Sequence, residues 1–263
     1  MPRAPQIVAA LAAAGLAGCH PPAPPAPVAI DPDALLAAAE AGASGGPVTS
    51  RFHVAIHSAD RDSLAWGGIV VAPPNRFRVD LAGPIGPPLV VLACDGEAVS
   101  AWLAATATFY TGPHADPAFR GWMGGVPGAE VVTALLLGRL SPGLGVPTGS
   151  GAAGPDGWSW WWTALNGGSL TAIVNPETTR LTSVLSKDGF GATHVSAVYS
   201  YADPASPFPT HLALTVPPLD TSLTVDFGPW QVANPVDAIF DLPVPAGATV
   251  VPLDGADTRP VGQ

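Results

Sequence analysis

The chain alternates apolar and polar residues with a period of two in several segments. In residues 51–57 and 76–81 every second residue is apolar, and the residues between them are mostly charged, polar or small. The apolar positions of these two segments are Phe52, Val54, Ile56, Phe77, Val79 and Leu81. This pattern predicts half-buried antiparallel strands.

Further apolar segments, separated by turn residues, continue the series along the chain. Asp95-Gly96 is typical of a hairpin turn, and Gly67 with Gly68 indicates a bulge or bend inside one strand. We expect roughly eleven strands, at residues 51–57, 64–71, 76–81, 89–93, 98–104, 158–165, 170–174, 178–185, 193–201, 211–216 and 223–227.

Two segments have helical patterns instead. The first is bracketed by Asp31, which can cap a helix, and Gly42, which can end it. The second, residues 129–137, is apolar on nearly every side and stops at Gly138, so we expect it to be buried on most sides. Strands with one or two inserted helices indicate a sheet covered by a lid and not a doubly wound α/β fold.

The first nineteen residues resemble a bacterial lipoprotein signal. Arg3 precedes an apolar stretch, and Leu16-Ala17-Gly18-Cys19 resembles the lipobox that ends in an acylated cysteine. The stretch is shorter than the roughly 20 residues of a membrane-spanning helix, so we expect cleavage before Cys19 and a covalent lipid on Cys19. The alternative is a plain secretory signal, which would leave the protein unanchored outside the cytoplasm.

The positions of the signal, the Pro-rich stretch and the predicted strands indicate the domain organisation. Residues 1–18 form the signal, and the Pro-rich residues 19–29 form an extended tether. Residues 30–250 form one large domain, because single β domains of roughly 200–250 residues are common. Residues 251–263 form a C-terminal tail.

Composition narrows the choice of partners. Only 11% of residues are charged, 48% are hydrophobic, and the net charge is −10. So few basic residues exclude nucleic acid as a partner and offer no polybasic patch for lipid headgroups. Attachment to a membrane would therefore depend on the lipid at Cys19. The second cysteine, Cys94, lies in an apolar segment and is expected to be a small buried residue.

The strand and turn motifs resemble the LolA/LolB-like group of envelope lipoproteins. The resemblance rests on residues 76–86, 95–96, 109–110, 135–138 and the closing residues 240–248. It implies a mainly β fold: a highly curved antiparallel half-barrel of roughly eleven strands with a helical lid over an apolar cavity that receives acyl chains. It also implies a place in the cell envelope. His20 after the cysteine favours the outer membrane, with the domain facing the periplasm.

An acyl-binding cavity needs an apolar sheet face and an apolar lid. Trp158, Trp160 and Trp162 share one parity of a strand, whereas Trp161 points to the other face. The candidate lining residues are Phe52, Val54, Ile56, Trp66, Phe77, Val79, Leu81, Leu135, Leu136, Trp158, Trp160 and Trp162. Each of them could equally fill an ordinary core, because alternation alone does not distinguish a cavity from a packed interior.

Catalytic and metal-binding interpretations find little support. Residues 42–46 match G-x-S-x-G without the strand and helix that this motif needs. Residues 149–154 match G-x-G-x-x-G between prolines, which is typical of a linker. His53 and His57 lie about 13 Å apart along a strand, too far to share a metal ion. We therefore expect no enzyme, no metal site and no cofactor beyond the lipid.

Two functions remain open. In the first, a lipid-anchored protein sequesters acyl chains of lipids or lipoproteins in its cavity, as a carrier or receptor. In the second, a non-catalytic assembly or scaffold lipoprotein has a filled core and binds another envelope protein on its outside.

Overall fold

The computed structural model describes residues 30–41, 45–83, 86–115, 128–154, 157–163, 167–203 and 205–253. The chain divides into two compact units, Met1–Asp31 and Pro32–Gln263, and every element described below belongs to the second. The predicted signal, Cys19 with its predicted lipid and the whole tether, residues 19–29, lie outside the described residues.

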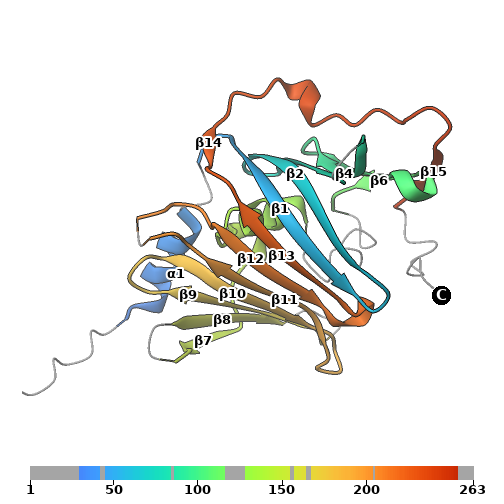
Figure 1. Ribbon diagram of the computed structural model, residues 1–263. Helices are drawn as coiled ribbons and strands as arrows, with labels where there is room; N and C mark the ends of the chain where they lie inside the picture. Colours follow the sequence, from blue (N-terminus) through green and yellow to red (C-terminus); the bar gives the residue numbers. More distant parts are fainter. Residues whose placement is uncertain are drawn as a thin grey trace, which may run out of the picture. The chain divides into compact units, whose positions relative to one another are not determined.

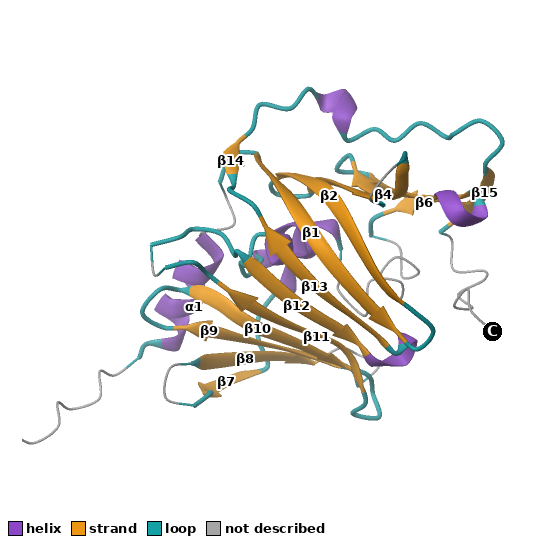
Figure 2. Ribbon diagram, in the orientation of Figure 1, coloured by secondary structure: helices purple, strands orange, loops and turns teal. Residues whose placement is uncertain are grey.

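The second unit is mostly β (Figures 1 and 2). In its described residues the α-helices are α1 (Pro32–Ala41) and α3 (Ala129–Leu136), close to both predicted helices. Its short 3-10 helices are η2 (Ala104–Thr106), η3 (Pro142–Leu144), η4 (Pro217–Leu219) and η5 (Asp237–Ile239). Its strands are β1 (Val48–Ser58), β2 (Asp62–Ala72), β3 (Arg76–Ala82), β4 (Pro88–Cys94), β5 (Ala98–Leu103), β6 (Thr108–Pro113), β7 (Gly149–Ala152), β8 (Trp158–Thr163), β9 (Ser169–Asn175), β10 (Arg180–Lys187), β11 (Thr193–Ser200), β12 (His211–Val216), β13 (Thr221–Phe227), β14 (Gln231–Val232) and β15 (Thr249–Pro252). Among the described residues, no helix is long and apolar enough to cross a bilayer.

The strands form one open, curved sheet. Its order is β15-β6-β5-β4-β3-β2-β1-β13-β12-β11-β10-β9-β8-β7, with β14 paired beside one end of β1. All pairs are antiparallel except β15 with β6, which is parallel. The half-barrel prediction is therefore confirmed, but fifteen described strands replace the expected eleven because β6, β7, β14 and β15 were missed.

Cross-strand register defines which residues share a face. Phe52 on β1 lies opposite Gly67 on β2, which lies opposite Leu81 on β3. We call the face that carries Phe52 the inner face, and the opposite one the outer face. The helix α3 packs on the inner face and lies behind β1 and β13 in Figure 1, where it is yellow-green.

Two apolar clusters occupy the inner face. One joins Phe77, Cys94 and Val99 to the α3 residues Val131 and Val132. The other joins residues of β1 and β2 to Leu137, which follows α3. Cys94 is fully buried, as expected, and burial raises the pKa of its thiol to about 11.

The glycine pair in β2 has a packing role and makes no bulge. The register between β1 and β2 continues through Gly67 and Gly68 without a shift, so the predicted alternative of a bulge is wrong. A Cβ on Gly67 would lie 2.7 Å from Cε1 of Phe52, so the phenyl ring occupies the space above this glycine. Gly68, on the outer face, has open space around it.

The first four residues of the G-x-G-x-x-G match form a strand, which corrects their interpretation as linker. These residues, Gly149–Ala152, make β7 and pair with β8 at one edge of the sheet. Gly149 lies opposite Trp161, and the indole ring of Trp161 occupies the space that a side chain at Gly149 would need. The strand contains only Gly, Ser and Ala, so no apolar alternation marks it.

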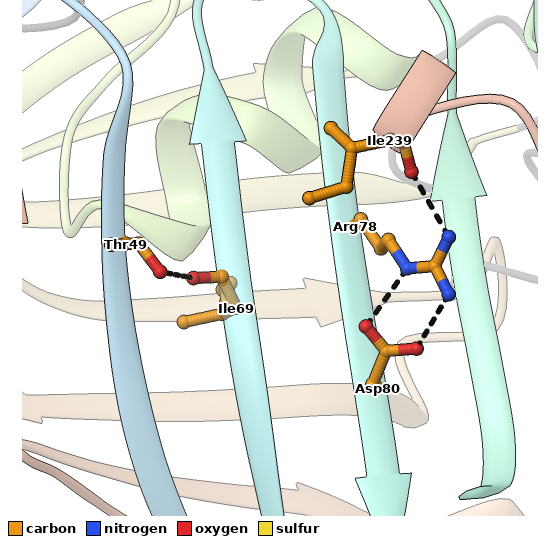
Figure 3. A network of polar contacts seen from close by, with 5 residues as sticks. All are labelled: Thr49, Ile69, Arg78, Asp80 and Ile239. Carbon is orange, nitrogen blue, oxygen red and sulfur yellow. Dashed lines mark hydrogen bonds and ion pairs between the residues drawn. The ribbon is translucent and has the colours of Figure 1, made fainter. Parts of the chain in front are cut away.

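A C-terminal segment, residues 233–248, crosses the outer face at β3. The guanidinium of Arg78 donates to both carboxylate oxygens of Asp80, at 2.8 and 2.9 Å, and to the carbonyl of Ile239 at 3.0 Å (Figure 3). Arg76 forms an ion pair with Asp237 and lies 5.0 Å from the ring centre of Phe240, which is 2% exposed. The segment then enters β15, which extends into the predicted tail.

Candidate functional site

The inner face carries nearly all of the predicted lining residues. Successive register pairs connect β1 through β13, β12, β11, β10 and β9 to β8, and they place Trp160 on the same face as Phe52. Trp158 and Trp162 share this parity with Trp160, and Trp161 points to the other face as expected. The tryptophans therefore continue the inner face toward its β7 edge.

The lining residues divide into packed and half-buried sets. The packed side chains, each at most 8% exposed, are Phe52, Val54, Phe77, Trp160 and Trp162. The half-buried ones are Ile56, Val79, Leu81, Leu135, Leu136 and Trp158. The packed residues are core, and only the half-buried set has apolar surface available to a ligand.

Half-buried aliphatic side chains lie on both sides of the packed residues in the middle of the inner face. Ile56 lies opposite Leu223, which lies opposite Leu214, and the neighbouring rows add further aliphatic side chains. We call these side chains the apolar strip; it consists of Ile56, Val79, Leu81, Leu214, Leu223 and Val225. Its members lie on β3, β1, β13 and β12, and the inner-face residues Ala65 and Ile69 of the intervening β2 are buried. From β3 to β12 the distance is about 19 Å at the usual strand spacing.

Trp66 does not belong to this face, which corrects its assignment as a lining residue. It lies opposite His53 on β1, and their rings meet edge to face at 6.0 Å. Both residues are on the outer face, and Trp66 is 42% exposed. Small residues, Ala65 and Gly67, take the inner positions of this part of β2.

Polar contacts fix the C-terminal end of α3. The hydroxyl of Tyr201 lies 3.1 Å from the carbonyl of Gly138 and 2.8 Å from that of Leu181, and Arg139 donates to the carbonyl of Pro207 at 2.7 Å. Burial raises the pKa of Tyr201 to about 12, although nearby Arg139 and Arg180 partly offset this shift. Burial lowers the pKa of Arg139. These groups tie the helical lid to β10 and to the loop before β12.

An aromatic pocket opens at the end of β13. Its volume is about 430 Å³, and its lining residues are Ser206, Pro207, Phe208, Thr210, Phe227, Gly228, Pro229 and Trp230. The ring of Trp230 lies 5.3 Å from that of Phe208 and 5.2 Å from that of Phe227, measured between ring centres. A second pocket, of about 360 Å³, includes Glu40 and Glu130 in its lining.

The predicted polar candidates lie apart from one another in the part of the chain that the structure describes. No three His, Cys, Asp or Glu side chains are gathered there as metal ligands. His53 and His57 are exposed on the outer face, and Nδ1 of His57 lies 3.0 Å from Asp62. The described part of the inner face therefore offers mainly apolar contact surface.

Sequence reasoning missed the contribution of β12 and β13. Leu214, Leu223 and Val225 complete the strip, and Phe227 lines the aromatic pocket. Residues 223–227 do alternate, so the strand was expected, but its position beside β1 is set by a pairing between distant parts of the chain. The alternation within 223–227 was the available signal.

Comparison with known proteins supports the fold. No family model matches the chain, and no curated protein matches it in sequence. Among solved structures, a LolA superfamily protein from Nitrosomonas europaea matches 81% of this chain and 99% of its own, with a TM-score of 0.55 and 10% identity. A DUF1329 family protein from Desulfovibrio piger matches 79% of this chain and 95% of its own, with a TM-score of 0.54 and 10% identity. The chain therefore has a LolA-like fold.

Proposed function

We propose that this protein is a non-enzymatic, lipid-anchored envelope protein that holds acyl chains of lipids or lipoproteins against its inner face, as a carrier or receptor. The apolar strip is the observation that carries the proposal. Its six side chains are half-buried, and all except Leu214 pack with one side against the cluster that joins β1 and β2 to Leu137. The LolA-like fold supports the same function class.

The physical argument is that the strip gains from being covered by hydrocarbon. Among the described residues of β1, β2, β3, β12 and β13, the inner-face positions carry no charged side chain. Each Å² of apolar surface removed from water contributes about 25 cal/mol. A hydrocarbon chain would be stabilised wherever it covers these side chains, whereas a charged ligand would find no oppositely charged partner on this part of the face.

A matched pair of variants on β13 tests the proposal. Leu223→Asp places a carboxylate in the strip, whereas Thr224→Asp places it one residue away on the outer face. We expect Leu223→Asp to weaken binding of a fluorescent fatty acid by more than about tenfold, because burying a charge against hydrocarbon is costly. The parent for both variants is the full chain with Cys19→Ala, which removes the predicted acylation site. Thr224→Asp should bind the fatty acid as tightly as this parent.

Leu223→Ala is a milder variant for the case in which Leu223→Asp does not fold. It removes contact area without adding charge, and we expect a smaller loss in the same direction. A parent protein that binds neither the fatty acid nor a triacylated peptide would refute the proposal.

The proposed anchor is the lipid on Cys19, supported by the lipobox-like residues 16–19. We propose the outer membrane, facing the periplasm, as its location. Labelled palmitate that enters the wild-type chain but not Cys19→Ala would support the anchor. Label at neither, or at both, would contradict it.

The second candidate is the scaffold function. The full burial of Phe77 and Trp160 favours it, because both were candidates for a cavity lining and instead form packed core. A stable envelope protein partner that co-purifies with a protein unable to bind fatty acid would support this function and exclude the carrier.

A further inference from the structure

The aromatic pocket at the end of β13 is continuous with the apolar strip. Leu223, Val225 and Phe227 occupy alternate positions on β13 and therefore share the inner face. Phe227 belongs to the wall of the pocket and also contacts the ring of Phe52, with ring centres 6.1 Å apart. From Val225 the apolar surface therefore extends in two directions. One direction crosses the strands through the strip, and the other follows β13 into the pocket.

The pocket offers ring surface and little hydrogen-bonding capacity. The indole nitrogen of Trp230 already donates to the carbonyl of Pro209 at 2.9 Å. The hydroxyl of Ser206 donates to the carbonyl of Phe208 at 2.8 Å, and the hydroxyl of Thr210 to that of Ser200 at 3.4 Å. None of the lining side chains is charged. A hydrocarbon chain can fill such a pocket with apolar contacts, whereas a charged headgroup would lose its hydration without gaining hydrogen-bonding or charged partners.

We propose that the pocket is a second apolar subsite and that the ligand is a lipid with two hydrocarbon chains, one in the strip and one in the pocket. This inference rests on the proposed function, because the first chain must occupy the strip. A volume of about 430 Å³ falls within the usual range of small-ligand pockets. Because the strip and the pocket meet at Val225, two hydrocarbon chains that occupy them would be joined to one another near this residue.

The test compares two ligands that share a headgroup and differ in the number of acyl chains. Lysophosphatidylcholine and phosphatidylcholine of equal chain length, delivered from cyclodextrin, displace a bound fluorescent fatty acid from the full chain carrying Cys19→Ala. Thr210→Phe fills the pocket, and Thr215→Phe is the control on the outer face of β12. We expect Thr210→Phe to weaken the two-chain lipid about tenfold, which is about 1.4 kcal/mol, and to leave the one-chain lipid within about twofold.

The outcomes separate this inference from the proposed function. Equal binding of the two-chain lipid by Thr210→Phe and Thr215→Phe would overturn the subsite while leaving the strip in place. Equal weakening of both lipids by Thr210→Phe would also overturn it, because one chain would then use the pocket. A parent protein that binds neither lipid would overturn the proposed function, and the subsite with it. Thr210→Leu, a smaller filling, should give an intermediate loss for the two-chain lipid alone.

Discussion

Phe240 tests whether the C-terminal segment is an integral part of the fold. This phenylalanine is 2% exposed, and the guanidinium of Arg76 lies 5.0 Å from its ring centre. Truncating a buried phenylalanine to alanine costs about 3 to 5 kcal/mol from lost burial and the remaining cavity. Losing the cation–π contact adds about 0.5 to 1 kcal/mol at a partly exposed site. We therefore expect Phe240→Ala to lower the free energy of unfolding by at least 3 kcal/mol, about the lower bound of these values.

Urea denaturation followed by tryptophan fluorescence measures this loss. Phe190→Ala is the matched control, because Phe190 is fully exposed at the turn between β10 and β11, and the same truncation there should stay within about 0.5 kcal/mol. Proteinase K should cleave residues 233–248 faster in Phe240→Ala than in the control, since the segment loses its main apolar contact. A loss below about 1 kcal/mol, with unchanged proteolysis, would refute the view that the segment is anchored by this ring.

Two further outcomes follow from the inner face. Gly67→Ala should destabilise the fold by about 1 to 3 kcal/mol, because its Cβ would meet the ring of Phe52, whereas Gly68→Ala, with open space around it, should be near neutral in the same urea assay. The raised pKa of Cys94, about 11 against an ordinary 9, means that the unfolded chain loses the thiol proton first as pH rises. The contribution of this thiol to stability is therefore complete below pH 9 and declines between pH 9 and 11, by up to about 2.7 kcal/mol. The measurement is the difference in the free energy of unfolding between the parent and Cys94→Ala at each pH, in which the contribution of the tyrosines, common to both proteins, cancels. A difference that stays constant over this interval would contradict the assignment.

The sequence predicted the strands that have one apolar and one polar face. Phe52, Val54 and Ile56 lie on the inner face, as alternation required, and the helix over 129–137 is buried as its composition indicated. Trp66 was misplaced because β2 has apolar residues on both faces, so that period alone leaves its orientation undecided. Only the register with β1, which puts Trp66 opposite His53, decides it.

Other features depend on contacts that local patterns do not contain. β7 consists only of Gly, Ser and Ala and so has no apolar alternation, and β15 is identified only by its parallel pairing with β6. Full burial of Phe77 and Trp160 and half-burial of Leu81 depend on where α3 and the loops cover the sheet. The division between core and strip is therefore a tertiary property, although the residue types on the inner face were readable in advance.

The pairing of β1 with β13 has a consequence for how the chain reaches its native state. On one side of this seam, β1 to β6 are joined to their neighbours in sequence order, and on the other side β7 to β13 are as well. Each half can form through local hairpins, but the seam joins residues as distant as Phe52 and Phe227. Contacts of such long sequence separation form slowly. The strip spans the seam, so its surface is complete only after nearly the whole domain has been synthesised, and the two halves expose apolar edges until then.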